Sequence, residues 1–120
     1  MVYNQQILNA MKTTTDLRFG EVFDLRSLIE PSSDKAAFLN LMNTPNGGVS
    51  LLALKEGQAL GEHAAPGELL VNVLEGEIDF NTEGASHRLT PGQIFMLGEG
   101  VLHSVKCIRD AKVLLCKVKP

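Results

Sequence analysis

From residue 45 onward, apolar residues form short runs that are separated by Gly and Pro. Gly or Pro recurs roughly every 8–12 residues, which is the spacing of turns in β-sandwiches and barrels. Several runs are rich in Val, Ile and Phe, whose shapes suit the pleated surface of a sheet. The predicted strands are residues 49–54, 69–74, 78–80, 85–89, 94–97, 101–108 and 112–118. With a weaker candidate at residues 35–42, they make about eight strands, the number in one jelly roll.

This pattern predicts an all-β fold with most strands joined by tight turns. Because both faces of the strands in such a barrel are largely covered, we expect near-continuous apolar runs rather than strict alternation. The Glu75, Gly76 and Glu77 sequence is interpreted as a turn between two strands, and Thr90-Pro91-Gly92 as another.

The first third of the chain has a different pattern. Ile7, Leu8 and Met11 fall on one helical face, so residues 4–11 form either a short helix or a loosely ordered end. Residues 22–29 fit a helix or the beginning of a strand equally well. We therefore predict an N-terminal segment at residues 1–20, helical or loosely ordered, and one β-barrel domain at residues 21–120.

Composition narrows the class of protein. A chain of 120 residues is long enough for one domain. Eleven basic against fourteen acidic side chains give a net charge of −3, which argues against nucleic acid as a partner. No apolar run approaches the roughly 20 residues of a membrane helix, and the first residues lack the basic lead of a secretory signal. Two cysteines make no disulfide framework, so we expect a cytoplasmic protein with reduced thiols.

Residues 57–76 resemble the first signature of the cupin superfamily. That signature runs Gly, five residues, His-x-His, three or four residues, Glu, six residues, Gly. Gly57, His63 and Gly76 match it. The resemblance implies a single-domain jelly-roll β-barrel of the cupin type, here with a short irregular or helical N-terminal segment.

Residues 91–103 resemble the second cupin signature, in which Pro-x-Gly-x-x-His supplies the last metal ligand. Gly100 and His103 match, and Gly98 stands where Pro is usual. The two segments are in the family's order and cover about half of the chain, while the strand pattern extends the likeness to most of it. The pair is therefore a more specific signal of the fold than either motif alone.

The sequence departs from the family's usual metal-ligand set of three His and one Glu. The second His position is Ala65 and the Glu position is Leu69, so His63 and His103 remain as the candidate metal ligands. Glu68 is one residue away from the ligand position. On a strand, that offset points its side chain to the opposite face.

Two imidazoles alone hold a metal weakly, because catalytic sites normally use three protein ligands. Cys107, Cys116 and Met96 are possible third donors, although no spacing requires any of them. A divalent transition metal such as Zn, Fe, Ni or Mn is thus one alternative, and a metal-free barrel is the favoured one. Without metal, His63 and His103 could still serve as an acid–base pair.

Ala65 and Leu69 in place of polar ligands make the barrel interior more apolar. That suits a small, largely apolar molecule held by a few polar groups, and it suits an ordinary packed core as well. We expect the interior to be lined by Ala65, Leu69, Val71, Met96 and Cys107.

Three functions follow as hypotheses. The first is a small cupin that binds a small molecule in its barrel. The alternative is a metal-dependent enzyme, dioxygenase-like or isomerase-like, that uses His63, His103 and an unidentified third ligand. The third is a structural or partner-binding dimer in which neither histidine matters. We expect a homodimer in each case, because it is common in the resembled family and because open sheet edges need protection.

Overall fold

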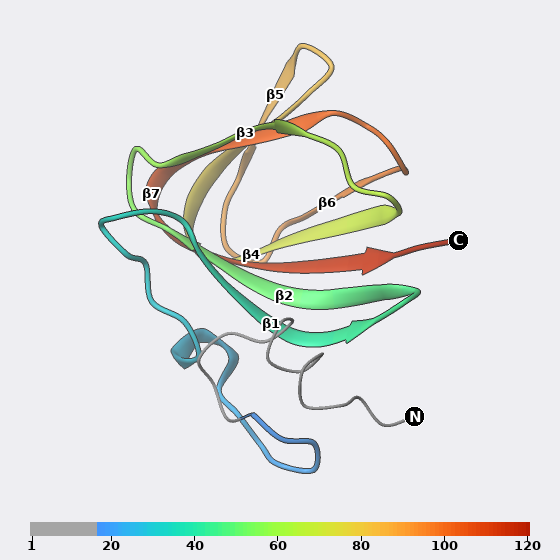
Figure 1. Ribbon diagram of the computed structural model, residues 1–120. Coiled ribbons are helices and arrows are strands. Elements are labelled where there is room, and N and C mark those ends of the chain that lie inside the picture. The colour runs from blue at the N-terminus through green and yellow to red at the C-terminus, as the bar shows by residue number, and fades with distance from the viewer. Residues whose placement is uncertain (1–16) are drawn as a thin grey trace.

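The computed structural model describes residues 17–120, which fold into seven β-strands and one short 3₁₀ turn (Figure 1). The elements are η1 (Leu25–Ser27), β1 (Ala37–Thr44), β2 (Gly47–Leu54), β3 (Ala59–His63), β4 (Glu68–Thr82), β5 (Ala85–Leu89), β6 (Ile94–Leu97) and β7 (His103–Val118). All strand pairs are antiparallel, in the order β1-β2-β7-β4-β5, while β3 pairs with β7 and β6 with β4. The predicted all-β jelly-roll barrel is confirmed.

The two longest strands, β4 and β7, pair along their whole length and run through the whole barrel. They pair from Glu68 opposite Val118 to Thr82 opposite His103. Each was predicted as two strands, and that prediction is wrong, because the polar residues between the apolar runs form a bend within one continuous strand. The register shifts three times between residues 73 and 78, where Gly76 adopts a φ of 77° against the backbone of Asp110. Glu75–Glu77 is therefore a bulged corner and not a turn.

The other predicted strands are found with small changes of boundary. Residues 85–89 and 94–97 match β5 and β6, and the weak candidate at residues 35–42 is β1. Strand β3 was not predicted, because four of its five residues are exposed and its sequence contains no apolar run. Its partner β7 supplies the hydrogen bonds that make it a strand.

The barrel core is filled from one face of each strand. Along β4, buried inward residues alternate with half-buried ones, so the outer face of this strand is only partly covered. Both faces are covered in β2, where Leu52 and Leu54 pack in the barrel while Leu51 and Ala53 pack on the outside of the sheet. The same holds in the middle of β7, where Ala111, Lys112 and Val113 are all buried. The barrel core is Leu52, Leu54, Leu69, Val71, Val73, Ile78, Phe80, Leu89, Leu97, Val105, Cys107, Ala111 and Val113.

A second, smaller cluster lies between the sheet and the chain that precedes β1. Its buried members include Ile29 and Leu39, and Leu25 and Leu28 pack against them. Residues 22–29 are neither the helix nor the strand that the sequence left open. They form an irregular stretch around η1, whose first turn is capped by the Asp24 side chain. The helix considered at residues 4–11 lies outside the described residues.

Lys112 of β7 binds the segment that precedes β1 to the sheet. Its side chain is only 8% exposed, and its Nζ donates to the carbonyl oxygen of Arg26 and to Glu30, at 3.2 Å from Oε1. Glu75 lies 3.8 Å away on the neighbouring strand. The buried ammonium is thus compensated by two carboxylates and a carbonyl, as burial of a charge requires.

Within residues 17–120, no helix is long and apolar enough to cross a membrane. In this part of the chain, β1, β3, β5 and β6 each pair with a single strand and so each has an open edge. Such an edge is a surface on which a second chain could pair, and the homodimer stays a prediction.

The two cysteines differ in their surroundings. Cys107 is 1% exposed in the barrel core, and its thiol contacts the carbonyl oxygens of Leu54 and Arg109. Burial raises the pKa of this thiol, so the reactive thiolate is disfavoured there. Cys116 is half-buried near the other end of β7.

We predict that iodoacetamide at pH 8 modifies Cys116 in the folded protein and leaves Cys107 intact, because only the thiolate reacts and Cys107 is both buried and held protonated. Peptide mass spectrometry of the labelled protein measures the two sites separately. Labelling in urea is the control and should reach both. Faster labelling of Cys107 in the folded protein would contradict the prediction.

The corner at Gly76 should be the backbone position most sensitive to a methyl group. A Cβ there would overlap the carbonyl oxygen of Asp110, in addition to the cost of a left-handed conformation. Gly84 has a similar φ of 81° but faces open space, so Gly84→Ala isolates the conformational cost of about 1–2 kcal/mol. We expect Gly76→Ala to lower the free energy of unfolding by about 4 kcal/mol or to prevent folding. Equal urea midpoints for the two variants would refute this.

Candidate functional site

The two histidines singled out in the sequence lie side by side. His63 ends β3, His103 begins β7, and the two residues face each other in the pairing of these strands. Their ring centroids are 4.2 Å apart in an edge-to-face arrangement. His103 is 2% exposed, whereas His63 is exposed. The pair thus reaches from the interior of the barrel to its surface.

Both imidazoles are oriented by their own backbone. The Nδ1 of His63 lies 2.7 Å from the carbonyl oxygen of Gly61, and the Nδ1 of His103 lies 3.0 Å from that of Val101. A carbonyl oxygen only accepts, so the hydrogen-bond network assigns the Nδ1 proton on both rings. Within residues 17–120, neither Nε2 has a hydrogen-bond partner. The Nε2 atoms are therefore the ones that remain for a ligand.

Aromatic packing holds the buried ring in place. His103 stacks on Phe80 with centroids 5.3 Å apart and planes inclined by 15°. Phe80 in turn packs against Phe95, and the third histidine, His87, also packs against Phe95. His103 consequently has little freedom to rotate, while His87 takes no part in the site.

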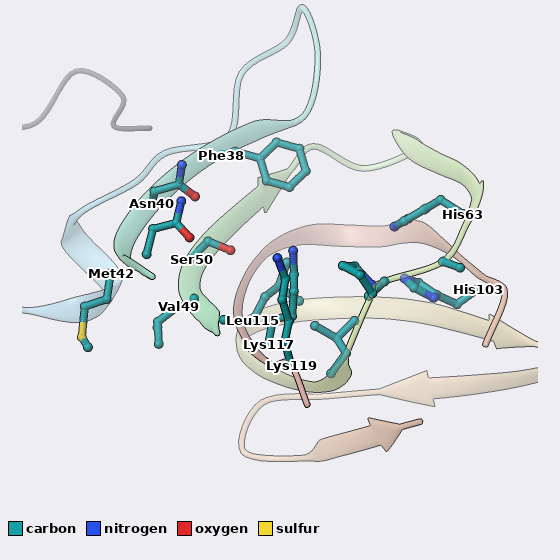
Figure 2. Close-up of a pocket in the computed structure, with 17 residues that line it drawn as sticks. Phe38, Asn40, Met42, Val49, Ser50, His63, His103, Leu115, Lys117 and Lys119 are labelled. Atoms are coloured by element: carbon teal, nitrogen blue, oxygen red, sulfur yellow. The ribbon is translucent and has the colours of Figure 1, made fainter. Parts of the chain in front are cut away.

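A cavity of about 340 Å³ opens beside the histidine pair (Figure 2). Its walls come from β1, β2, the beginning of β4, both ends of β7 and the loop after β3. The lining residues are Phe38, Asn40, Met42, Asn43, Gly47, Gly48, Val49, Ser50, His63, Ala64, Ala65, Pro66, Leu69, His103, Leu115, Lys117 and Lys119.

Two of the five predicted lining residues belong to this wall. Ala65 and Leu69 line the cavity together with the histidines. Val71 and Cys107 point into the barrel but are packed in its core, each 1% exposed, and neither is part of the wall.

The expectation that Met96 lines the barrel is wrong. Its side chain is 68% exposed. Met96 pairs with Leu70 across β4 and β6, whereas the inward positions of β4 are Leu69 and Val71. Because successive side chains of a strand point to opposite faces, Met96 lies outside the barrel.

The polar residues on the wall opposite the histidines were not predicted from the sequence. Asn40 and Ser50 come from the inner faces of β1 and β2, and Lys117 comes from the end of β7. A signal for Lys117 was present: Val113 and Leu115 are inward positions, and Lys117 continues their alternation.

The described residues do not provide a complete metal-ligand set. Within residues 17–120, no three His, Cys, Asp or Glu side chains lie close enough together to hold one metal ion. The third donors considered in the sequence, Cys107, Cys116 and Met96, are not in the cavity wall. Glu68 is absent from the wall as well, in accord with its outward position. The site thus offers two nitrogen ligands where a metal centre needs at least three.

Comparison with known proteins gives results at the level of structure only. No family model matches the sequence, and no curated protein is detectably similar to it. A conserved protein of unknown function from Streptococcus pyogenes is 26% identical, with 93% of this chain and 98% of that chain covered and a TM-score of 0.81. An RmlC-like cupin protein from Desulfovibrio desulfuricans is 25% identical over 82% of this chain and 95% of that chain, with a TM-score of 0.73.

A cupin 2 conserved barrel domain protein from Leptotrichia buccalis is 31% identical, with a TM-score of 0.78. The match covers 81% of this chain and 47% of that one, so the chain spans about half the length of this relative. Taken with the jelly-roll topology and the paired histidines at the matching signature positions, these similarities show that the chain belongs to the cupin superfamily, as a small cupin domain with Ala65 and Leu69 at two usual ligand positions.

Proposed function

We propose that the protein binds a small molecule in the cavity between the histidine pair and strands β1 and β2. The observation that carries this proposal is the cavity itself. Its volume of about 340 Å³ falls within the range of small-molecule sites. The space is an open cleft, whose lining includes exposed residues such as Phe38 and buried ones such as Leu69 and His103.

The composition of the wall supports the same function. The apolar part of the cavity wall includes the side chains of Phe38, Leu69 and Leu115. A few polar groups converge on the space, among them Ser50 and the two free Nε2 atoms. Such a combination of apolar walls and a small number of directed polar groups is typical of ligand pockets. At the roughly 30 Å³ that a liquid water molecule occupies, the space holds on the order of ten non-hydrogen atoms.

A metal-dependent enzyme, dioxygenase-like or isomerase-like, is the second candidate. One observation favours it: a backbone carbonyl fixes Nδ1 of both His63 and His103, and metal-binding histidines are commonly oriented in this way. The incomplete ligand set among residues 17–120 argues against it, and we derive no catalytic step through a metal.

Filling the cavity should abolish binding without unfolding the protein. We predict that Ala65→Phe weakens binding of any probe from a panel of benzoate, benzamide, succinate and succinamide by at least tenfold, because the new ring occupies the space beside the histidines. Ala85→Phe, on exposed β5 and outside the wall, is the matched control and should leave affinity unchanged. Titrations followed by ¹H–¹⁵N NMR measure both affinity and fold. A panel in which nothing binds, or in which both variants bind normally, would overturn the proposal.

Metal content separates the second candidate from the first. With two imidazole ligands, we predict well under one equivalent of Zn, Fe, Ni or Mn in protein purified without chelator or nickel resin. Plasma mass spectrometry of the wild type and of the His63→Ala/His103→Ala variant makes the measurement. A full equivalent that disappears in the double variant would mean that a further donor completes the site, and the enzyme hypothesis would then lead.

A further inference from the structure

The cavity carries positive charge and no compensating carboxylate. Lys117 and Lys119 are in its wall, and none of the described lining residues is Asp or Glu. The chain as a whole has a net charge of −3, so this local excess runs against the overall balance. In Figure 2 the side chains of both lysines extend toward the space between the β1–β2 strands and the histidine pair.

The backbone at the end of β7 is built to place these lysines at the cavity. Gly47 and Gly67 pack directly against the main chain of residues 117–119, and a Cβ at either glycine would overlap a carbonyl oxygen there. The N–H of Lys119 also donates to the carbonyl oxygen of Asn46 at 2.7 Å. The lysines therefore project from a fixed strand end and not from a loose terminus.

Two lysines of β7, Lys112 and Lys117, differ in how their charge is neutralised. Lys112 is neutralised by Glu30 and Glu75 and by a backbone carbonyl. Lys117 is half-buried, with its Cα opposite those of Gly48 and Leu69, and it has no ion pair within residues 17–120. No carboxylate of the described lining residues neutralises the Lys117 ammonium, so it is available to pair with an anion that enters the cavity.

We infer that the occupant of the cavity is a small organic carboxylate whose anionic end pairs with Lys117, and this inference rests on the proposed function. Lys119 adds a second positive charge at the same end. Toward the other end, the unprotonated Nε2 atoms of His63 and His103 accept a hydrogen bond from a hydroxyl group of the ligand. The apolar wall between the two ends covers a short carbon skeleton. The ligand class is thus a carboxylic acid of modest size, with a hydroxyl group as a favourable addition.

The test compares each acid with its neutral amide in the full-length protein. Benzoate and succinate should bind more tightly than benzamide and succinamide, and 4-hydroxybenzoate more tightly than benzoate, by calorimetry or NMR titration. Affinity for the acids should fall as salt is added, because screening weakens the ion pair. Lys117→Met keeps most of the side-chain stem and removes the charge, and should weaken acid binding about tenfold or more. Lys106→Met removes the same charge from an exposed position on β7 outside the wall, and should change affinity less than twofold.

The outcomes distinguish this inference from the function on which it rests. Amides that bind as well as the acids, or equal losses in Lys117→Met and Lys106→Met, would overturn the carboxylate site and leave small-molecule binding intact. Binding of inorganic phosphate without either carboxylate would also overturn it, since the ligand would then be a different anion. If neither acids nor amides bind, the proposed function fails together with the inference.

Discussion

The close approach of Gly76 to the backbone of Asp110 is the constraint on which the barrel depends. If β7 were straight, the fourteen residue steps from His103 to Lys117 would span about 46 Å. That length exceeds 41 Å, the longest dimension of the molecule. The β4–β7 pair must therefore bend, and it does so where three register shifts coincide with a glycine that has no Cβ to strike the opposite strand. One half of the pair then belongs to the β1–β2 side of the barrel and the other half to the β3 side.

The candidate site exists because of that bend. His103 is the first residue of β7 and Lys117 lies close to its last, yet both line one cavity. On β4, Leu69 lies opposite Lys117, and Thr82 at the far end lies opposite His103. A curled pair of strands brings groups from both of its ends around a common space, whereas a flat sheet would keep them on a single surface.

One cavity contains both the two substituted ligand positions and the lysines that have no carboxylate partner among residues 17–120. Ala65 and Leu69 leave space and apolar surface beside His63 and His103. Lys117 faces that space without the carboxylates that neutralise Lys112 under the chain preceding β1. Lys112 has carboxylate partners and Lys117 has none among the described lining residues, and this contrast is the basis on which we infer an anionic ligand. The proposed chemistry of the site is thus recognition of an anion rather than coordination of a metal.

The sequence by itself determined the all-β class, most strand positions, the barrel family and the pairing of His63 with His103 as candidate site residues. Turn residues, apolar runs and motif spacing are properties of residues close together in the chain, so these features could be predicted without the structure. The sequence did not determine that β4 and β7 are continuous, that β3 is a strand, or which face of each strand becomes the inside. Met96 was assigned to the interior and lies outside, because its face is set by the pairing of β6 with β4. Lys117 was passed over and lines the cavity, since only the bend at Gly76 carries the end of β7 back to the histidines. Those decisions depend on contacts between residues far apart in the chain, and only the tertiary structure contains them.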